Sequence, residues 1–306
     1  MWIYLLKRVI QGIPVLFLVA TLTFVLMRIV PGGPFDRDKK LPPEILANIE
    51  AKYHLDQPVW RQYLIYMKEI GGGDFGPSYK YVGRDVNDII CDTFPVSLIL
   101  GLLAMTVMVV IGIPAGVFSA YWRDSWMDHG CIFIATLGVS VPNFVLGSLL
   151  VLLFAHHWHL LPPALWEGPR HALLPAITLG AGYAGYIARL TRSTVLEALE
   201  KDYIRTARAK GLGEGKVLSK HVLGNSMAPI VSVLGPLAAG LVTGSFIIEY
   251  IYSIPGMGSF FITAVTNRDY PLIMGVTMVY ASVIVTVNIA ADLMYVWLDP
   301  RVRLDK

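Results

Sequence analysis

Three groups of residues have the types and spacing that could support chemistry, and the first is a histidine cluster. His156, His157 and His159 lie close enough in the sequence to share a metal ion. Trp158 stands among them, and mixed aromatic and polar residues are also ordinary where a membrane span ends. The cluster follows directly on an apolar run. We therefore expect an interfacial position for these side chains and no metal site.

The second group is the glycine-rich segment GLGEGKV at 211–217, which looks like a phosphate-binding loop. That loop requires a Gly five positions before the Gly of its Gly-Lys pair, and Ser or Thr after the Lys. Lys210 and Val217 occupy those positions, and no strand precedes the segment. We expect this chain to bind neither nucleotide nor any other cofactor itself.

The third group centres on Ser245, a hydroxyl inside an apolar run, where an intramembrane serine protease would place its nucleophile. Such a protease also requires a histidine base at the same depth. No histidine lies inside any of the long apolar runs. The chain is therefore not expected to be an enzyme.

The elements that position these residues follow from the composition. The 306 residues are 55% hydrophobic and only 15% charged, with a mean hydropathy of +0.58, whereas soluble domains are about 25% charged. Runs long enough to cross a bilayer occupy 9–30, 96–121, 131–155, 173–190, 228–249 and 272–298. Backbone polar groups inside lipid must be satisfied within each segment, so these runs should be helices. The predicted fold class is an all-α membrane protein with six transmembrane helices.

Basic residues predict how these helices are oriented, because short cytoplasmic loops are rich in Lys and Arg. The opposite side has Arg170 and Arg268 in its short loops. Both termini are therefore expected to be cytoplasmic, and Cys91 and Cys131, at opposite ends of one span, to be free. The basic residues assigned to the cytoplasmic side are Lys7, Arg8, Arg123, Arg192, Lys201, Arg205, Arg208, Lys210, Lys216, Lys220, Arg301, Arg303 and Lys306.

The long segment 31–95 is predicted to form a small helical subdomain outside the membrane. LPPEILANIEAKYHL and PVWRQYLIYMKEI have helical spacing, and VNDIICDTF is a third short amphipathic piece. The subdomain either caps the helix bundle or provides a docking surface for an external partner, and both remain open. The fourth and fifth runs are rich in Gly and Ala, which allows helices to approach closely in lipid.

The segment 192–220 is the most basic short stretch, with seven Lys/Arg and four Asp/Glu. STVLEALEKDYIRTARAKG has helical spacing, Gly211 and Gly213 interrupt it, and KVLSKHVL resumes the helix. Ala207 and Gly211 keep the turn slim enough to enter a groove, and the surrounding charges can meet acidic groups of a partner. Binding of anionic lipid is the alternative. A lipid patch needs no glycine-hinged hairpin, so we favour a protein partner.

These residues resemble a known family, the permeases of ABC importers. Its coupling loop carries Glu-Ala-Ala, three residues, Gly and a later Pro, where this chain has Arg205-Thr206-Ala207, three residues, Gly211 and Pro229. The Glu-Ala pair is replaced, as in the peptide-importing branch, where RTARAKGL recurs. Segments along the whole chain are similar to the first permease subunit of bacterial oligopeptide importers: PGGPF, LPPEILANIEAKYHLDQP, GDFGPSYKY, IEYIYSIPGMG, NRDYPL and LDPRVR.

The resemblance implies the six-helix ABC permease fold in a bacterial inner membrane. It divides the chain into a tail and first helix at 1–30, the external subdomain at 31–95, the transmembrane core at 96–298 and a cytoplasmic tail at 299–306. It also implies a peptide path shared with a second, homologous permease, and an external binding protein that delivers oligopeptides. Two cytoplasmic ATPases would hold ATP and Mg. Membrane lipids are further partners, and nucleic acid is not. The alternatives are a dipeptide, nickel or other small-solute permease, or a non-transporting assembly subunit.

Two groups of candidate site residues follow from the motif and its position. Within the predicted coupling loop, 192–228, the expected ATPase contacts are Arg205, Thr206, Ala207, Arg208, Lys210, Gly211 and Leu212. After the fifth run, the apolar segment that follows PGMG is expected to form a short helix dipping back to line an external gate, or else a surface-packed turn. The gate and pathway candidates are Ser245, Glu249, Pro255, Gly256, Met257 and Gly258.

Overall fold

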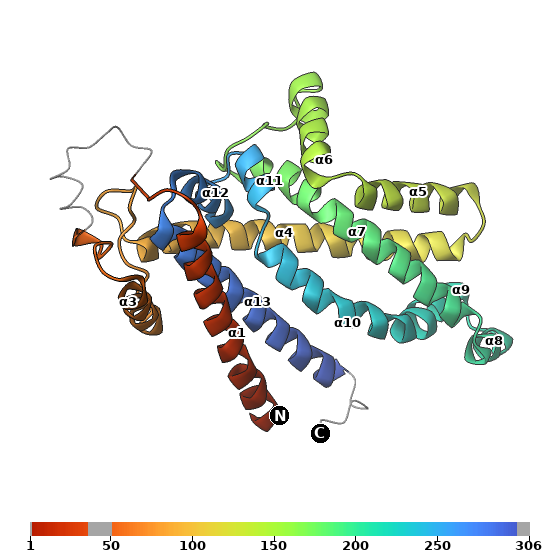
Figure 1. Cartoon of the computed structure of the whole chain (residues 1–306). Coiled ribbons are helices and arrows are strands. Elements are labelled where there is room, and N and C mark those ends of the chain that lie inside the picture. The colour runs from red at the N-terminus through yellow and green to blue at the C-terminus, as the bar shows by residue number, and fades with distance from the viewer. Residues whose placement is uncertain (1, 36–50, 299–306) are drawn as a thin grey trace.

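The computed structural model describes residues 2–35 and 51–298, and the described chain is a bundle of long helices (Figure 1). No β-strand forms in this part, although Pro77 and Asp85 make an isolated antiparallel bridge. The long helices are α1 (Trp2–Ile29), α4 (Val86–Tyr121), α5 (Trp126–Ser140), α7 (Pro169–Leu199), α10 (Leu223–Val242) and α13 (Tyr270–Leu298). The shorter ones are α3 (Val59–Gly71), α6 (Asn143–Leu150), α8 (Asp202–Ala209), α9 (Glu214–Lys216), α11 (Phe246–Ile251) and α12 (Met257–Asn267), with π-helical segments η1 (Val151–His157) and η2 (Val217–Val222).

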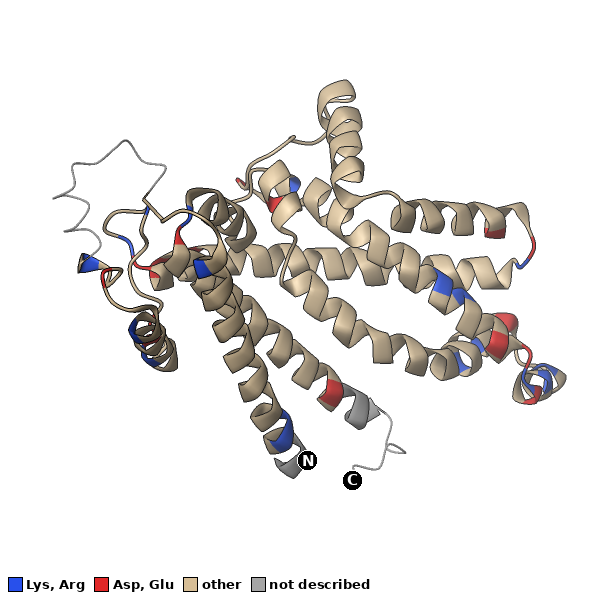
Figure 2. Ribbon diagram, viewed as in Figure 1, with Lys and Arg blue, Asp and Glu red and all other residues tan. Residues whose placement is uncertain are grey.

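Four described helical segments are long and apolar enough to cross a membrane, and a bent pair makes a possible fifth. The four are Leu5–Ile29, Val86–Tyr121, Glu214–Ile251 and Tyr270–Leu293. The predicted fourth run lies within α7, which is less apolar because Gly, Ala, Tyr and Arg189 interrupt its hydrophobic residues. This arrangement is consistent with the predicted six spans. Charged residues gather at the helix ends and in the predicted external subdomain, and the middles of the long helices carry few (Figure 2).

The third predicted run differs from the single straight helix that was expected. It comprises α5 followed by α6 and η1, bent by 110° at the break between Ser140 and Asn143. Pro142 explains the break, because a proline disfavours helical geometry in the residue before it. Val141 is accordingly extended, with φ −80° and ψ 124°. The run therefore turns where α5 meets α6.

The centre of the bundle is the contact between α4 and α7, where glycines bring the two backbones together. A Cβ atom on Gly112 of α4 would lie 2.8 Å from the Ala184 carbonyl oxygen, and one on Gly180 of α7 would lie 2.7 Å from the Ala104 carbonyl oxygen. Gly116 is equally tight against Ala188. Close packing through small residues is thus confirmed for α7.

The predicted external subdomain packs on α1 and on the start of α13. Tyr63 and Tyr66 of α3 lie against Phe24 of α1, with ring centroids 5.3 and 5.7 Å apart. The fully buried Asp269 accepts hydrogen bonds from the Ser78 hydroxyl and from the Tyr79 amide. The predicted first helix falls mainly in 36–50, outside the described residues. The predicted third piece is not separate, since VNDIICDTF forms the first turns of α4.

Candidate functional site

The predicted helix–turn–helix of the basic segment is present at the end of α7. Helix α8 follows α7 after a short turn, and α9 with η2 leads on into α10 (Figure 1). The inner face of α8 is held by hydrophobic packing. Ile204 and Ala207 are buried against Val195, Val217 and Val222. Ala207 is therefore part of the packing within this chain.

Gly211 follows the end of α8 in the left-handed conformation, at the position where the sequence predicted an interruption of the helix. Its φ is +77°, and its amide donates to the Arg208 carbonyl oxygen at 2.9 Å. The Leu212 amide reaches back to the Ala207 carbonyl oxygen at 3.3 Å, which completes a glycine helix cap. A Cβ atom at position 211 would meet no atom within 4 Å. The space in front of Gly211 is thus open in this chain.

The outer face of α8 combines exposed and internally paired charges. Arg205 is 78% exposed and lies 3.6 Å from Asp202, and Thr206 is also exposed. Lys210 is exposed and forms no ion pair with any described residue. Arg208 is different, because Glu214 binds its guanidinium through two hydrogen bonds of 2.8 and 3.2 Å. The charge on Arg208 is therefore paired within the turn, whereas Arg205, 3.6 Å from Asp202, and Lys210 stay exposed.

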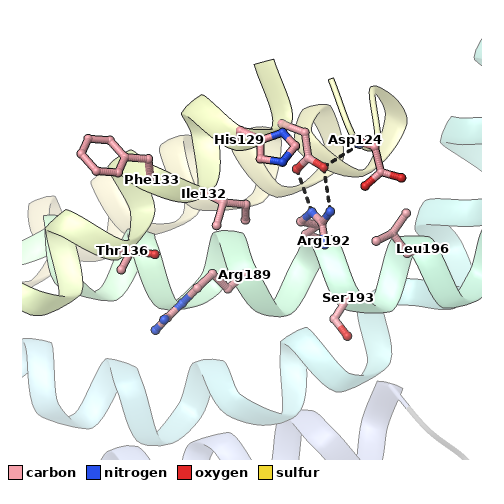
Figure 3. Close-up of a pocket in the computed structure, with 10 residues that line it drawn as sticks. Asp124, His129, Ile132, Phe133, Thr136, Arg189, Arg192, Ser193 and Leu196 are labelled. Atoms are coloured by element: carbon pink, nitrogen blue, oxygen red, sulfur yellow. Dashed lines mark hydrogen bonds and ion pairs between the residues drawn. The ribbon is translucent and has the colours of Figure 1, made fainter. Parts of the chain in front are cut away.

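Beside this loop, a cavity of about 690 Å³ lies between α5 and α7 (Figure 3). Asp128 and Arg192 line the cavity, and their side chains make a bidentate pair with distances of 2.8 and 2.7 Å. Arg189, one turn earlier on α7, also lines the cavity. Its side chain extends along α7 away from the Asp128–Arg192 pair (Figure 3).

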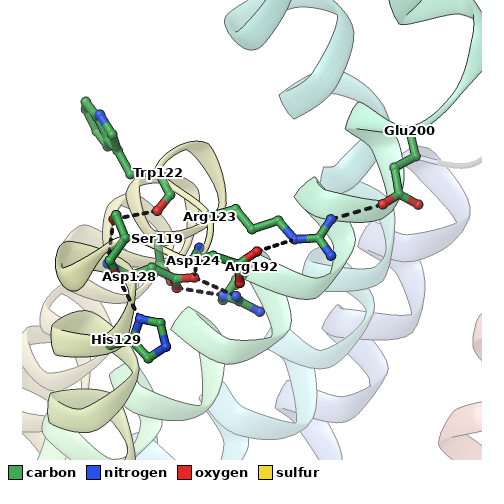
Figure 4. A network of polar contacts seen from close by, with 9 residues as sticks. Ser119, Trp122, Arg123, Asp124, Asp128, His129, Arg192 and Glu200 are labelled. Atoms are coloured by element: carbon green, nitrogen blue, oxygen red, sulfur yellow. Dashed lines mark hydrogen bonds and ion pairs between the residues drawn. The ribbon is translucent and has the colours of Figure 1, made fainter.

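The Asp128–Arg192 pair belongs to a network that ties the α4–α5 turn to α7 (Figure 4). Asp128 is 2% exposed and also accepts hydrogen bonds from the Ser119 hydroxyl and, at 2.9 Å, from the Asp124 amide. Arg123 reaches Glu200 at 3.2 Å, beyond the end of α7. This network immobilises the helix end from which α8 projects. Sequence reasoning missed it, because the paired residues are far apart in the chain.

The gate candidates form a second cluster, at the opposite end of the bundle. The predicted fifth run is interrupted at Gly244, whose φ is +75°, and Ser245 then caps the short helix α11. The short apolar helix expected after PGMG is confirmed as α12. Glu249 of α11 is fully buried, and it accepts hydrogen bonds from the Gly258 amide at 2.7 Å and the Ser259 amide at 3.3 Å. Its carboxylate therefore caps the first turn of α12.

Glycines surround this carboxylate closely. A Cβ atom on Gly244 would lie 2.6 Å from Glu249 Oε1, one on Gly258 would lie 2.9 Å from Oε2, and one on Gly256 would collide with Oε2. The Ser97 hydroxyl of α4 accepts a hydrogen bond from the Met257 amide at 2.8 Å. Met257 is buried, and Pro255 is exposed at the surface. The gate candidates thus meet in a closed cluster, and Glu249 binds backbone amides instead of facing an open cavity.

Metal binding finds no support in the described part of the chain. There, no group of three or more His, Cys, Asp or Glu side chains is placed to hold an ion. His156 and His157 end η1, beside the exposed Trp158. Both cysteines are free.

Comparison with known proteins relates this arrangement to transport proteins. The family described as "Binding-protein-dependent transport system inner membrane component" matches residues 112–304, and "Binding-prot-dependent transport system membrane comp, N-term" matches residues 1–101. The "Dipeptide transport system permease protein DppB" of Bacillus subtilis (strain 168) is 44% identical over 303 residues, which is 99% of this chain and 98% of the relative. The "Oligopeptide transport system permease protein OppB" of Escherichia coli (strain K12) is 41% identical over 302 residues, covering 98% and 99%.

Solved structures support the fold at lower sequence identity. The structure titled "Inward facing conformations of the MetNI methionine ABC transporter: CY5 SeMet soak crystal form" has a TM-score of 0.58 and 17% identity, covering 69% of this chain and 96% of that chain. "Crystal structure of an amino acid ABC transporter with histidines" has a TM-score of 0.52 and 17% identity, with 68% and 94% covered. The helical core thus has the ABC-importer permease fold.

Proposed function

Because this chain belongs to the family of binding-protein-dependent transport system inner membrane components, we propose that it is a permease subunit of an ATP-driven peptide importer. One observation carries the proposal: the similarity to peptide permeases extends over almost the full length of both chains. It therefore includes the predicted external subdomain and the α8 turn as well as the membrane core. Two relatives with similar identities are named for dipeptides and for oligopeptides, so the shared cargo class is peptides, and we retain oligopeptides as the expected cargo.

The proposed machine has five parts. This chain and a second, homologous permease form the path, an external binding protein delivers the peptide, and two cytoplasmic ATPases supply the energy. ATP and Mg belong to the ATPases. The exposed turn at Gly211, with Arg205, Thr206 and Lys210 beside it, seats in a cleft of one ATPase. At the other end, Glu249 holds α12 in place as part of the external gate.

The proposal includes an inner-membrane topology with both termini and Gly211 in the cytoplasm and Tyr53 outside. Single cysteines at positions 53 and 211, in a Cys91→Ser, Cys131→Ser background, test it with a membrane-impermeant thiol reagent. In intact cells, position 53 should react and position 211 should react only after the membrane is opened. Labelling of position 211 in intact cells contradicts the topology.

Transport itself is tested with vesicles that contain all five parts and, in parallel, with each part omitted in turn. ATP-dependent uptake of a labelled tetra- or pentapeptide should require this chain. Uptake restricted to dipeptides favours the dipeptide alternative. Uptake of nickel without peptide, or undiminished peptide uptake without this chain, refutes the proposal, and the latter result identifies an assembly subunit.

A further inference from the structure

A set of polar side chains on α5 and α7 runs from just outside the predicted spans 131–155 and 173–190 into their apolar part. We call this set the polar stripe. All its members are exposed, and four of the five line the cavity between the two helices, while the fifth follows one turn further along α5. The polar stripe consists of His129, Thr136 and Ser140 on α5 and Arg189 and Ser193 on α7.

The hydroxyl groups of the polar stripe have unused hydrogen-bonding capacity. Other exposed hydroxyls on the long helices bond to their own backbone, as Thr106 does to the Leu102 carbonyl oxygen at 2.9 Å and Thr286 to the Ser282 carbonyl oxygen at 2.7 Å. This bond satisfies a hydroxyl that faces lipid. Thr136, Ser140 and Ser193 make no side-chain hydrogen bond to any described residue. These hydroxyls are therefore available to polar partners from outside the described part of the chain.

The Arg189 side chain also has unused hydrogen-bonding capacity, and it carries a charge. Its guanidinium has no hydrogen bond or ion pair with any described residue, while Arg192, one turn away in the same cavity, is occupied by Asp128. Figure 3 shows the Arg189 side chain directed away from that pair. Arg189 lies one residue before the end of the predicted span 173–190. A charged side chain there faces water, a lipid headgroup or a partner, because hydrocarbon cannot solvate it.

The length of the polar stripe argues against a lipid headgroup as the ligand. Helix α5 begins at Trp126, next to the charged Arg123–Asp124 turn. At 1.5 Å per residue, Thr136 lies about 15 Å and Ser140 about 21 Å along the axis from that start. The headgroup layer on one side of a bilayer is only about 5–8 Å deep. For a helix parallel to the membrane normal, the polar stripe therefore continues past the depth that lipid headgroups occupy.

We propose that the polar stripe is this chain's contribution to the lining of the peptide path, and that Arg189 binds the carboxylate of the passing peptide. This inference rests on the proposed function. Hydroxyl groups and the open nitrogen of His129, whose Nδ1 contacts the Ser125 carbonyl oxygen at 2.7 Å, can exchange hydrogen bonds with peptide amides. A guanidinium provides a two-pronged donor that matches a carboxylate.

The first test measures access of water to the polar stripe in the assembled complex. Thr136→Cys and Ile134→Cys are compared in the background without native cysteines. Ile134 is the matched control, because it lies on the same helix and is 70% exposed but apolar. A charged, water-soluble reagent reacts with a thiolate, which forms only in water. It should label Thr136→Cys, and a saturating transported peptide should protect that position, while Ile134→Cys stays unlabelled. Equal labelling of both positions, or none at Thr136→Cys, overturns the inference.

The second test compares peptides with a free carboxyl terminus and the same peptides as C-terminal amides. Uptake by each variant is divided by wild-type uptake of the same peptide, so that preferences of the binding protein cancel. Arg189→Gln should lower uptake of the free acid at least about tenfold, equivalent to about 1.4 kcal/mol, and leave the amide within about twofold. Arg189→Lys should retain most free-acid uptake, because it keeps the charge.

The other possible partners of Arg189 give different results. Equal loss for acid and amide, with a complex that lacks the second permease, assigns Arg189 to a subunit interface and overturns the inference. If Arg189→Gln loses free-acid uptake selectively only in vesicles that contain anionic lipid, Arg189 is assigned to a lipid headgroup. That result also overturns the inference. Failure of the wild-type complex to take up any peptide refutes the proposed function. Wild-type uptake without the acid–amide difference in Arg189→Gln refutes only the role of Arg189.

Discussion

Replacing Gly211 distinguishes the steric requirements of this chain from those of a partner that binds the turn. We expect Gly211→Trp to abolish peptide-stimulated ATP hydrolysis and to weaken retention of the ATPase, while the membrane helices still insert. The physical reason is the open space in front of Gly211. A Cβ atom placed there meets no described atom within 4 Å. We therefore expect the main steric conflict of an indole to be with whatever seats on the turn.

The intrachain cost of this substitution can be worked out from the backbone. Gly211 has a φ of +77°, where a residue with a Cβ loses about 1–2 kcal/mol. Asn tolerates this conformation better than other residues, so Gly211→Asn should cost less and retain most coupling. Gly215→Trp is the matched control, since Gly215 is also exposed, a Cβ atom added to it would meet no atom within 4 Å, and its φ is not positive.

The assay is copurification of the ATPases followed by peptide-stimulated ATP turnover in the reconstituted complex. Wild type, Gly211→Asn and Gly215→Trp should couple, and Gly211→Trp should not. A Gly211→Trp complex that assembles and couples normally refutes the reasoning, and the anionic-lipid interpretation of the basic segment then regains support. Equal failure of Gly215→Trp shows that any bulky side chain in this loop is disruptive, and the assignment to Gly211 is lost.

Three further substitutions test the packing at the two ends of the bundle. Asp128→Ala leaves the Arg192 guanidinium without its buried partner, which should destabilise the protein by about 3 kcal/mol and lower the unfolding temperature of the purified complex; an unchanged temperature contradicts a stabilising role. Glu249→Gln keeps the shape but loses charge-assisted bonds to the α12 amides, so it should slow peptide transport with assembly intact; loss of the complex would instead indicate a structural role. Gly256→Ala forces a methyl group against Glu249 and should destabilise the protein by about 1–3 kcal/mol. An unchanged stability would mean that the residues around Glu249 can move to accommodate the methyl group.

Much of this fold could be predicted from the sequence, because bilayer physics leaves few choices for long apolar runs. The first and last spans, the helix–turn–helix at Gly211 and the short helix after PGMG all follow local rules of hydropathy and glycine conformation. The bend at Pro142 also follows a local rule, the effect of a proline on the residue before it. It was not predicted, because the whole run is apolar and was interpreted as one helix. The second span was expected to begin after Pro95, whereas α4 continues through this proline.

The contacts between distant segments could not be predicted. Glu249 was expected at the outer end of a span, yet Gly244 and the two glycines of PGMG enclose it, and each glycine alone indicates only a turn. The pairing of Asp128 with Arg192 joins two helices, and nothing in the local sequence marks either residue as the other's partner. Ala207 was interpreted as a slim contact for a partner. Its burial became evident only once Val195 and Val217 were placed around it.

The glycine contacts between α4 and α7 have a mechanical consequence. Because the two backbones touch at Gly112, Gly116 and Gly180, neither helix can roll over the other without collision, and the pair moves as one rigid lever. Helix α7 has 31 residues and is therefore about 46 Å long. A tilt of about 5° imposed at the α8 end moves the far end of such a lever by about 4 Å. A shift of that size is comparable to a peptide backbone's width. In the proposed importer, a small rotation of an ATPase seated at Gly211 would therefore move the opposite face by a distance that matters to a passing peptide.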